Sequence, residues 1–396
     1  MVAASKTYDW VVVGGGLAGA AASYELARQG LSVLLLDSLS PQRATRYSYG
    51  GIPYWSGTTP LMRQLCQEGY ERHQILSAEL ESDTQLRELD LLLTVAAGED
   101  PNQLQKQYAD CGTVPTVLSV AEACEREPLL NPNAIAGALT VAHGHVDPLL
   151  LIEAYRTAFL RLSGVSRVAT VTQIEPGPYP KVVTMDGAIA CANVLVCAGG
   201  LSRRLLQQSG LAIRQYFTHA ELIETPPLDL CLKALVMPAN MQRFGLEAGA
   251  TQSENEPLWQ QETQRIAPPA LDPGAIQFLD RRICMGQISR TLGNPFAPSD
   301  LARSEVKIRQ AVGHILPALK DVPGHCHRCL VAFSHDSLPL IGPISDASTV
   351  QIFSGFGSPF AILPPLAQRF AAHVASGTDD AIVADLSPQR PSLALN

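Results

Sequence analysis

Three glycines and one acidic residue near the start of the chain have the types and spacing needed to bind a phosphate-containing ligand. Gly14, Gly16 and Gly19 form a G-x-G-x-x-G pattern, and Asp37 follows roughly 20 residues on. In this pattern the glycines allow a tight turn, a close approach of backbone to a pyrophosphate, and close packing of helix on strand. A carboxylate at Asp37 can accept hydrogen bonds from an adenosine ribose and would repel a 2′-phosphate, which argues against NADP. The pattern predicts a dinucleotide site without distinguishing NAD from FAD.

The segments around these glycines have the composition of a βαβ unit that would position them. Residues 9–13 form an apolar run typical of a buried strand, an alanine-rich helix is predicted after the glycines, and residues 34–37 form a second apolar run. The N-terminus of that helix would face the bound anion. A strand before, a helix after, the glycine spacing and the acid all agree, so a purely structural turn is the less favoured alternative.

A second cluster of chemically capable side chains is the run His-Cys-His-Arg-Cys at residues 325–329. Cys326-x-x-Cys329 with neighbouring histidines is similar to half of a zinc site, but no second ligand pair occurs elsewhere at ligand spacing. The chain has nine cysteines, scattered and mostly inside apolar runs. We therefore expect reduced core thiols and no metal.

The rest of the chain predicts elements of two kinds. Residues 59–96 show helical periodicity, which predicts two amphipathic helices, and residues 149–162 predict a helix that Asp147 caps. From residue 213 to residue 286 the pattern becomes strand-like and antiparallel, with Pro- and Gly-rich connections. The predicted strands of that region are 215–224, 234–237, 275–279 and 282–288.

Composition excludes several classes of protein. The chain has 396 residues, of which 46% are hydrophobic and 17% charged, and its net charge is −8. This profile is typical of a well-packed chain with room for two domains, and basic residues do not cluster, so we expect no nucleic-acid partner. Apolar stretches are broken well before 18 residues, so no transmembrane segment is expected. The short stretch before the first strand leaves no room for a signal peptide, which predicts a cytoplasmic location.

Six separated pieces of the sequence together resemble one family. The chain is similar to the D-amino-acid-oxidase-like superfamily of FAD flavoproteins, particularly its glycine oxidase and monomeric sarcosine oxidase branch. The pieces cover nearly the whole chain and are Gly14-x-Gly16-x-x-Gly19 with Asp37, Ser48-Tyr49-Gly50-Gly51-Ile52, Gly144-His145-Val146-Asp147-Pro148, Val196-Cys197-Ala198-Gly199, Asp336-x-Leu338-Pro339-Leu340-Ile341-Gly342 and Gly355-Phe356-Gly357.

The resemblance implies an α/β fold, α+β overall, with a discontinuous Rossmann-like FAD-binding domain. That domain would comprise residues 1–58, 145–212 and 325–396. A substrate-binding domain built on a mixed, largely antiparallel sheet would be inserted at residues 59–144 and 213–324. The implied partners are a small-molecule substrate and oxygen or another electron acceptor.

The resemblance also implies the residues that would contact FAD. The 48–52 loop would lie near the flavin, Val171 would meet the adenine through its backbone, and residues 197–199 would pass beneath the pyrophosphate. Gly342 and the C-terminal glycine loop would approach the isoalloxazine ring, where a helix N-terminus can stabilise negative charge. The full predicted set is Gly14, Gly16, Leu17, Ala18, Gly19, Asp37, Ser38, Arg46, Ser48, Tyr49, Gly50, Gly51, Ile52, Val171, Cys197, Ala198, Gly199, Gly342, Gly355, Phe356, Gly357, Ser358 and Pro359.

The chain departs from the family pattern where relatives bind a substrate carboxylate. Amino-acid oxidases of the family use an arginine five residues before Asp336, where this chain has Val331. The sarcosine oxidase branch uses a lysine after the C-terminal glycine loop, at about Ala361 here. Ion pairs of this kind contribute much of the specificity for small amino acids. An arginine elsewhere would have to replace them, and the candidates are Arg46, Arg281, Arg282 and Arg328.

Cys329 matches a further feature of the sarcosine oxidase branch. A cysteine seven residues before the equivalent of Asp336 carries the flavin there through a thioether, and Cys329 has that interval. The alternative is a buried thiol at the end of a strand.

The chemistry that the resemblance implies is hydride transfer from a substrate C–H to flavin N5. Such a reaction needs binding and orientation more than acids and bases. The candidate catalytic residues are Tyr49, His219 and His335, and Tyr54, Trp55 and Tyr216 are further candidates on the substrate side. The expected reaction is oxidation of a C–N bond in a small amine or amino acid. A 2-hydroxy-acid oxidoreductase, an NAD-linked dehydrogenase and a flavin-binding protein with little turnover are the alternatives.

Overall fold

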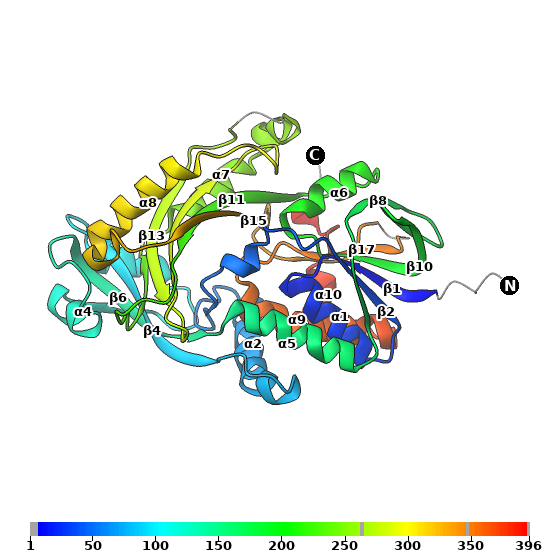
Figure 1. The fold of residues 1–396 in the computed structure, drawn as a ribbon, viewed down its shortest axis with the longest axis horizontal. Coiled ribbons are helices and arrows are strands. Elements are labelled where there is room, and N and C mark those ends of the chain that lie inside the picture. The colour runs from blue at the N-terminus through cyan, green and yellow to red at the C-terminus, as the bar shows by residue number, and fades with distance from the viewer. Residues whose placement is uncertain (1–6, 262–264, 346–347, 394–396) are drawn as a thin grey trace.

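The computed structural model describes residues 7–261, 265–345 and 348–393 (Figure 1). Two sheets are the centres of two lobes, and helices cover the outer faces of both. The chain passes between the sheets several times, so each sheet is assembled from segments that are distant in sequence.

The first sheet is mostly parallel. Within the described residues its strands run in the order β16-β17-β10-β1-β2-β7, and β9 joins β8 to β10. Its strands are β1 (Tyr8–Val13), β2 (Val33–Asp37), β7 (Val165–Val168), β8 (Val171–Glu175), β9 (Lys181–Thr184), β10 (Gly187–Val196), β16 (Leu340–Pro343) and β17 (Val350–Ser354).

The second sheet is mixed and largely antiparallel. Its order in the described chain is β15-β11-β14-β13-β12-β4-β6-β3, with β5 paired to β6. Its strands are β3 (Gly51–Ile52), β4 (Arg87–Ala96), β5 (Thr116–Leu118), β6 (Ile135–His145), β11 (Gln215–Glu224), β12 (Leu235–Pro238), β13 (Ala270–Gln277), β14 (Ile283–Arg290) and β15 (His325–Ser334).

Helices connect these strands and close the outer faces of the sheets. The α-helices are α1 (Leu17–Arg28), α2 (Pro60–Glu79), α3 (Pro101–Gln105), α4 (Val120–Arg126), α5 (Pro148–Arg161), α6 (Ser202–Gln208), α7 (Gln242–Ala250), α8 (Leu301–Ile315), α9 (Pro359–Ser376) and α10 (Ala381–Asp385). Short 3-10 helices occur at Ala44–Tyr47, Lys106–Tyr108, Gly199–Leu201, Ser253–Gln260, Pro317–Leu319 and Pro391–Leu393.

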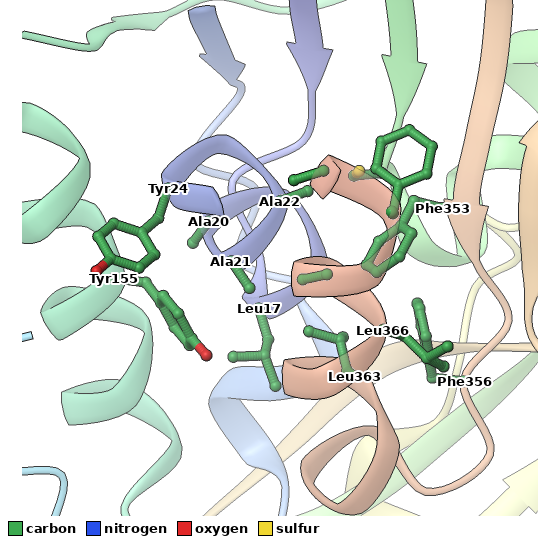
Figure 2. Close-up of a cluster of buried hydrophobic side chains, with 14 of the residues drawn as sticks. Leu17, Ala20, Ala21, Ala22, Tyr24, Tyr155, Phe353, Phe356, Leu363 and Leu366 are labelled. Atoms are coloured by element: carbon green, nitrogen blue, oxygen red, sulfur yellow. The ribbon is translucent and has the colours of Figure 1, made fainter. Parts of the chain in front are cut away.

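The core of the first lobe positions the glycine turn. Helix α1 contacts both α5 and α9, and Figure 2 shows the small residues Ala20, Ala21 and Ala22 where these helices approach. Tyr24 of α1 lies against Tyr155 of α5, with ring centroids 5.8 Å apart. Because small side chains let helices pack closely, the alanine-rich sequence fixes the start of α1 at the end of β1.

The second sheet is buried on both faces. Helix α8 packs on one face against β11, β13, β14 and β15. The buried side chains of this face include Ile223, Met285 and Ile308. Leu91, Leu93 and Leu222 belong to the other face, which turns toward the first lobe.

Several predicted elements are confirmed, and one prediction is wrong. The strand predicted at 215–224 is β11, and Asp147 caps α5 through the backbone amides of Leu149 and Leu150. The pattern over residues 59–96 predicts two helices, but only α2 is helical; the second half is β4, which pairs with β6 along its length. The run Leu91–Leu93 is buried, and an apolar run buried on a sheet cannot be separated from a helical pattern by periodicity alone.

Sheet membership also bears on the expected domain boundaries. Strands β3 and β15 fall in segments assigned to the FAD-binding domain, yet both pair within the second sheet. The loop that follows β2 and the strand at 325–334 therefore join the two lobes. In the part of the chain that the structure describes, no helix is long and apolar enough to cross a membrane.

Candidate functional site

A cavity of about 970 Å³ lies between the two sheets. One end is formed by the glycine turn after β1 and by the end of β2. The other end is formed by strands of the second sheet and by the start of α7. The carboxyl ends of parallel strands, where ligands bind in open α/β sheets, therefore open onto a chamber whose far wall is the second sheet.

The glycine turn is shaped as a close-fitting cradle. Gly14 has φ of +108°, and a Cβ there would lie 2.5 Å from the carbonyl oxygen of Cys197. A Cβ at Gly19 would lie 1.7 Å from the carbonyl oxygen of Gly14, which is the close helix–strand packing that the pattern predicts. A Cβ placed on Gly16 would have the Thr45 hydroxyl as its nearest neighbour, at 3.8 Å, so this position faces open space. The turn therefore fits a pyrophosphate at the N-terminus of α1.

Asp37 lies at the cavity and is held by cationic neighbours that the sequence did not indicate. Its Oδ2 atom accepts a hydrogen bond from Arg43 Nη1 at 3.0 Å, and Arg156 Nη1 lies 3.7 Å away. Its Oδ1 atom accepts from the amide of Leu39. The carboxylate is placed to meet a ribose, but Arg43 offsets its charge, so repulsion of a 2′-phosphate is weaker than the sequence suggested.

Most of the residues predicted to bind FAD line this cavity. Gly51 and Val171 lie on its wall, as do the 197–199 and 355–359 segments. The predicted residues in the lining are Gly14, Gly16, Leu17, Ala18, Asp37, Ser38, Ser48, Tyr49, Gly51, Val171, Cys197, Ala198, Gly199, Gly355, Phe356, Gly357, Ser358 and Pro359. Lining the cavity places these residues where a cofactor could reach them, and their individual roles in binding FAD stay predictions.

Five predicted cofactor residues lie outside the lining. Gly19 serves helix packing, and Ile52 is part of the hydrophobic core. Gly50 has φ of +72°, and a Cβ there would lie 2.1 Å from the Val146 carbonyl oxygen. Gly342 has φ of +115° within β16, and Arg46 is half-exposed beside Glu224. Backbone requirements therefore account for the three glycines.

The three candidate catalytic residues are not placed together. Tyr49 lines the cavity, but its hydroxyl lies 3.1 Å from the carbonyls of Gly274 and Gly286, and burial raises its pKa well above the ordinary value. His219 lies on the face of β11 opposite the lining residues Ala220 and Leu222. Its Nε2 atom is 3.1 Å from the Asn294 carbonyl. His335 follows β15 and does not line the cavity. Neither histidine is brought to the site.

The four candidate arginines are likewise used elsewhere. Arg281 pairs with exposed Asp229, and Arg282 donates to Asp147 Oδ2 at 2.6 Å. Arg328 donates to the Ala297 carbonyl. With Arg46, none of them lines the cavity.

Arg243 is the cavity-lining arginine at the second-sheet end, and sequence reasoning missed it. It stands in the first turn of α7, and its Nε atom is 3.2 Å from Glu247 Oε1. Among the described residues, no hydrogen-bond acceptor engages its Nη atoms. Cys329 and Val331 of β15 line the same cavity as Arg243. A short amphipathic helix containing one arginine gives no motif by which it could have been found.

His143 and Trp55 form a second polar feature of the cavity wall. Trp55 Nε1 donates to His143 Nδ1 at 3.0 Å, and both side chains are buried. Burial lowers the pKa of His143 to about 3, so the imidazole is neutral at ordinary pH. Trp55 was a candidate from sequence, whereas His143 gave no signal because it lies inside an ordinary strand.

The usual positions of the carboxylate anchors differ in their access to the cavity. Val331 lines the cavity, so the site lacks the positive charge that an arginine at this position would supply. Ala361 is fully buried in α9 and faces no ligand space. Cys329 lines the cavity as well, and burial raises the pKa of its thiol to about 12.

The His-Cys-His-Arg-Cys run lies along β15, where successive side chains point to opposite faces. Cys326 packs beside the core under α8, while Cys329 belongs to the core facing the first lobe. Across residues 7–261, 265–345 and 348–393, no group of three or more His, Cys, Asp or Glu side chains is arranged to hold a metal ion.

A glycine cradle, a paired carboxylate and a chamber between two sheets are features of a dinucleotide-binding protein whose cofactor and substrate share one cavity. A family model described as FAD dependent oxidoreductase, the DAO family, matches residues 9–373. The chain belongs to this family, and its cofactor is FAD. The expected enzyme class, an FAD-dependent oxidoreductase, agrees with this family.

Similar curated proteins come from this family. The chain is 27% identical over 224 residues to monomeric sarcosine oxidase of Arthrobacter sp. (strain TE1826), covering 52% of this chain and 55% of that protein. It is 27% identical over 236 residues to glycine oxidase of Geobacillus kaustophilus (strain HTA426), covering 54% and 61%. The matched segments thus span 55–61% of these relatives' own length.

A solved structure shows the same fold over nearly the whole chain. The glycine oxidase of Geobacillus kaustophilus superposes with a TM-score of 0.79 at 19% identity, covering 98% of this chain and 99% of that one. The expected fold class, with a Rossmann-like FAD-binding part and a mixed second sheet, is confirmed.

Proposed function

We propose that this protein oxidises a C–N bond of a small amine or amino acid by hydride transfer from the substrate carbon. The observation that carries the proposal is the single continuous cavity that joins the Gly14–Gly16 cradle to the second sheet. Its volume of about 970 Å³ is at the upper end of the range for ligand pockets, which suits a long cofactor with a small substrate beside it.

The substrate end of the cavity has an apolar wall and few charges. Leu91, Leu93, Leu235 and Met237 project from β4 and β12. The charged residues of the lining at this end are Arg243 and Asp272. An apolar wall lowers the local dielectric constant, which strengthens each polar contact made within the chamber.

We propose Arg243 as the group that binds a substrate carboxylate in place of the missing anchors. Arg243 lines the same cavity as Val331 of β15, which stands where relatives have the carboxylate-binding arginine. Glu247 Oε1 forms an ion pair with its guanidinium at 3.2 Å from Nε, although Nε itself is buried without a hydrogen bond. The two Nη atoms are therefore the donors that a ligand in the cavity would engage. Asp272 is the other nearby charge, but its carboxylate accepts from the amides of Gln242 and Arg243 at the N-terminus of α7.

The remaining chemistry follows from this placement. When bound, FAD supplies the two-electron acceptor for the hydride. The protein binds and orients the substrate so that its C–H approaches that acceptor, which requires no nucleophile or carboxylate pair. Ser48, Tyr49, Gly51 and the 355–359 loop line the same cavity as the cradle and Arg243.

The test is an anaerobic titration of the purified holoenzyme with candidate substrates while the visible spectrum is recorded. We expect small amines or amino acids to bleach the flavin bands, and 2-hydroxy acids of matched size to leave them unchanged. Bleaching by hydroxy acids alone would assign the alternative C–O chemistry. Flavin bands that no member of either class bleaches would support a binding role with little turnover and contradict the proposal.

A further inference from the structure

The imidazole of His143 is fixed in one state by its surroundings. It lies on β6, opposite Leu89 of β4, and is 4% exposed. Trp55 Nε1 can only donate, so the 3.0 Å hydrogen bond to Nδ1 requires that nitrogen to be the acceptor. Because a neutral imidazole carries one proton, the proton must then reside on Nε2.

The Nε2 atom projects beside the loop predicted to approach the flavin. A Cβ placed on Gly51 would lie 2.5 Å from Nε2, so the imidazole occupies the space that a side chain at Gly51 would fill. Both residues line the cavity. A glycine at position 51 leaves room for the imidazole of His143 in its observed position, so the position of the ring depends on this glycine.

The Nε2–H has no acceptor in the described part of the protein. Trp55 makes the one hydrogen bond to this ring among those residues, and it is at the other nitrogen. Buried polar atoms that lack a partner and are sealed by protein include Nδ1 of His73 and Nε2 of His145, but not Nε2 of His143. Since the residue is almost wholly buried, Nε2 gains its access from the cavity. An unpaired donor in an apolar chamber is costly unless a ligand accepts from it.

We propose that His143 donates a hydrogen bond from Nε2 to an oxygen atom of the bound ligand, and that Trp55 is the positioning residue that holds this tautomer. The oxygen belongs either to a ring carbonyl of the cofactor or to the carboxylate of the substrate. The inference rests on the proposed function, because it requires both ligands to meet at this cavity.

The role differs from that of a general base. With its lone pair committed to Trp55 and its proton on Nε2, the imidazole cannot accept a proton without breaking that hydrogen bond. It therefore acts as a neutral donor, and its effect should depend on geometry and not on ionisation. The ring of Trp55 also lies beside that of Tyr108 on the cavity wall, with the ring centroids 6.1 Å apart.

The experiment compares three variants of the holoenzyme. His143→Leu removes the donor, His143→Gln keeps an N–H near the place of Nε2, and Trp55→Phe removes the group that fixes the tautomer. FAD affinity is measured by titrating apoprotein, and substrate-site affinity by titrating bound flavin with acetate and benzoate. Circular dichroism melting identifies any variant that fails to fold, and the Gln variant, which retains volume and polarity, remains readable in that event.

We expect His143→Leu to weaken one of the two affinities roughly 10-fold, the size of a lost hydrogen bond to a ligand, and His143→Gln to restore most of it. Loss of FAD affinity would assign the acceptor to the cofactor, and loss of carboxylate affinity to the substrate. Trp55→Phe should produce a smaller loss of the same affinity. Equal behaviour of His143→Leu and wild type, or equal loss in the Leu and Gln variants, would overturn the proposal. Wild-type protein that binds FAD but is bleached by no amine would instead contradict the proposed function, and the FAD arm would still decide the role of His143.

Discussion

At the scale of single residues, the charges in the cavity are paired in a way that leaves specific atoms available. Arg43 forms an ion pair with Asp37 at the cradle end, and Glu247 forms one with Arg243 at the other end. Partial pairing of this kind holds a guanidinium in place and leaves part of its hydrogen-bonding fork for a ligand. The residue proposed to bind the substrate carboxylate, Arg243, is thus an arginine whose Nη atoms have no acceptor among the described residues.

Replacing Arg243 tests this directly. Arg243→Gln should raise the KM of a carboxylate-bearing amine by roughly 10- to 100-fold, because a hydrogen bond to a charged group contributes about 1.5–3 kcal/mol. Steady-state kinetics with the substrate found by flavin bleaching provide the measurement. Arg281→Gln is the matched control, since Arg281 is exposed and lies outside the cavity. An unchanged KM in Arg243→Gln would exclude the residue as the anchor.

Cys329 permits a second test at the residue scale. The thiol lines the cavity and the charge of Arg243 partly offsets the effect of burial on its pKa. If it carries the flavin as in the sarcosine oxidase branch, acid-precipitated wild-type protein should remain yellow and Cys329→Ser should release its flavin to the supernatant. The absorbance of pellet and supernatant decides the matter, and a colourless wild-type pellet refutes the link.

The sequence predicted site residues whose role depends on backbone and missed those whose role depends on distant contacts. Gly14 and Asp37 could be found because a turn and a strand end impose local rules. Arg243 and His143 could not, because their importance comes from β15 and Trp55, which lie far away in sequence. The same limit explains why His219, a plausible candidate by type, lies on the wrong face of its strand for the cavity.

At the scale of elements, one carboxylate caps the N-terminus of α7 from a neighbouring strand. Asp272 of β13 accepts hydrogen bonds from the amides of Gln242 at 2.7 Å and Arg243 at 3.0 Å, so it caps the helix from a neighbouring strand. The helix N-terminus is also the more positive end of its dipole, which favours the carboxylate there. The position of Arg243 therefore depends on β13.

Asp272→Ala should loosen α7 without removing any atom of Arg243. We expect a loss of about 0.5–2 kcal/mol in the free energy of unfolding, the usual size of a lost N-terminal cap, together with weaker carboxylate binding. Urea denaturation and benzoate titration measure the two effects, and Asp300→Ala, which uncaps α8 far from the lining, is the control. Normal benzoate affinity in Asp272→Ala would show that α7 needs no such cap to place its arginine.

Elements with a clear period and clear ends were predictable, whereas a buried apolar run was not. The strand at 215–224 and the helix after Asp147 follow from alternation and from a cap. Residues 91–93 are apolar in succession because both faces of β4 are buried, Leu92 on one side of the sheet and Leu91 and Leu93 on the other. The pairing of β4 with β6 and β12 is invisible in the local pattern.

At the scale of the whole molecule, buried histidines should control the pH dependence of stability. Burial lowers the pKa values of His73 and His219 to about 4, and of His143 and His145 to about 3. The ordinary value in an unfolded chain is about 6.5, so between pH 6.5 and 4 the unfolded state binds more protons. The free energy of unfolding should therefore be fully present above pH 6.5 and fall as the pH drops.

His73→Gln isolates one of these contributions. His73 lies 2.7 Å from the Phe360 carbonyl, and glutamine can keep a donor there while losing the titration. Urea unfolding at pH 7, 6 and 5 should show a slope shallower than that of wild type by up to roughly 1.4 kcal/mol per pH unit. Parallel stability curves for the two proteins would mean that His73 is not a source of acid sensitivity.

The threading of one chain through two sheets also orders events during synthesis on the ribosome. Strands β1 and β2 emerge first, but β16, β17 and the 355–359 segment of the cavity wall come last. Domains generally fold as units as the chain emerges, and this cavity belongs to no early unit. The nascent chain thus carries its glycine turn without the opposing wall until the 355–359 segment has been synthesised.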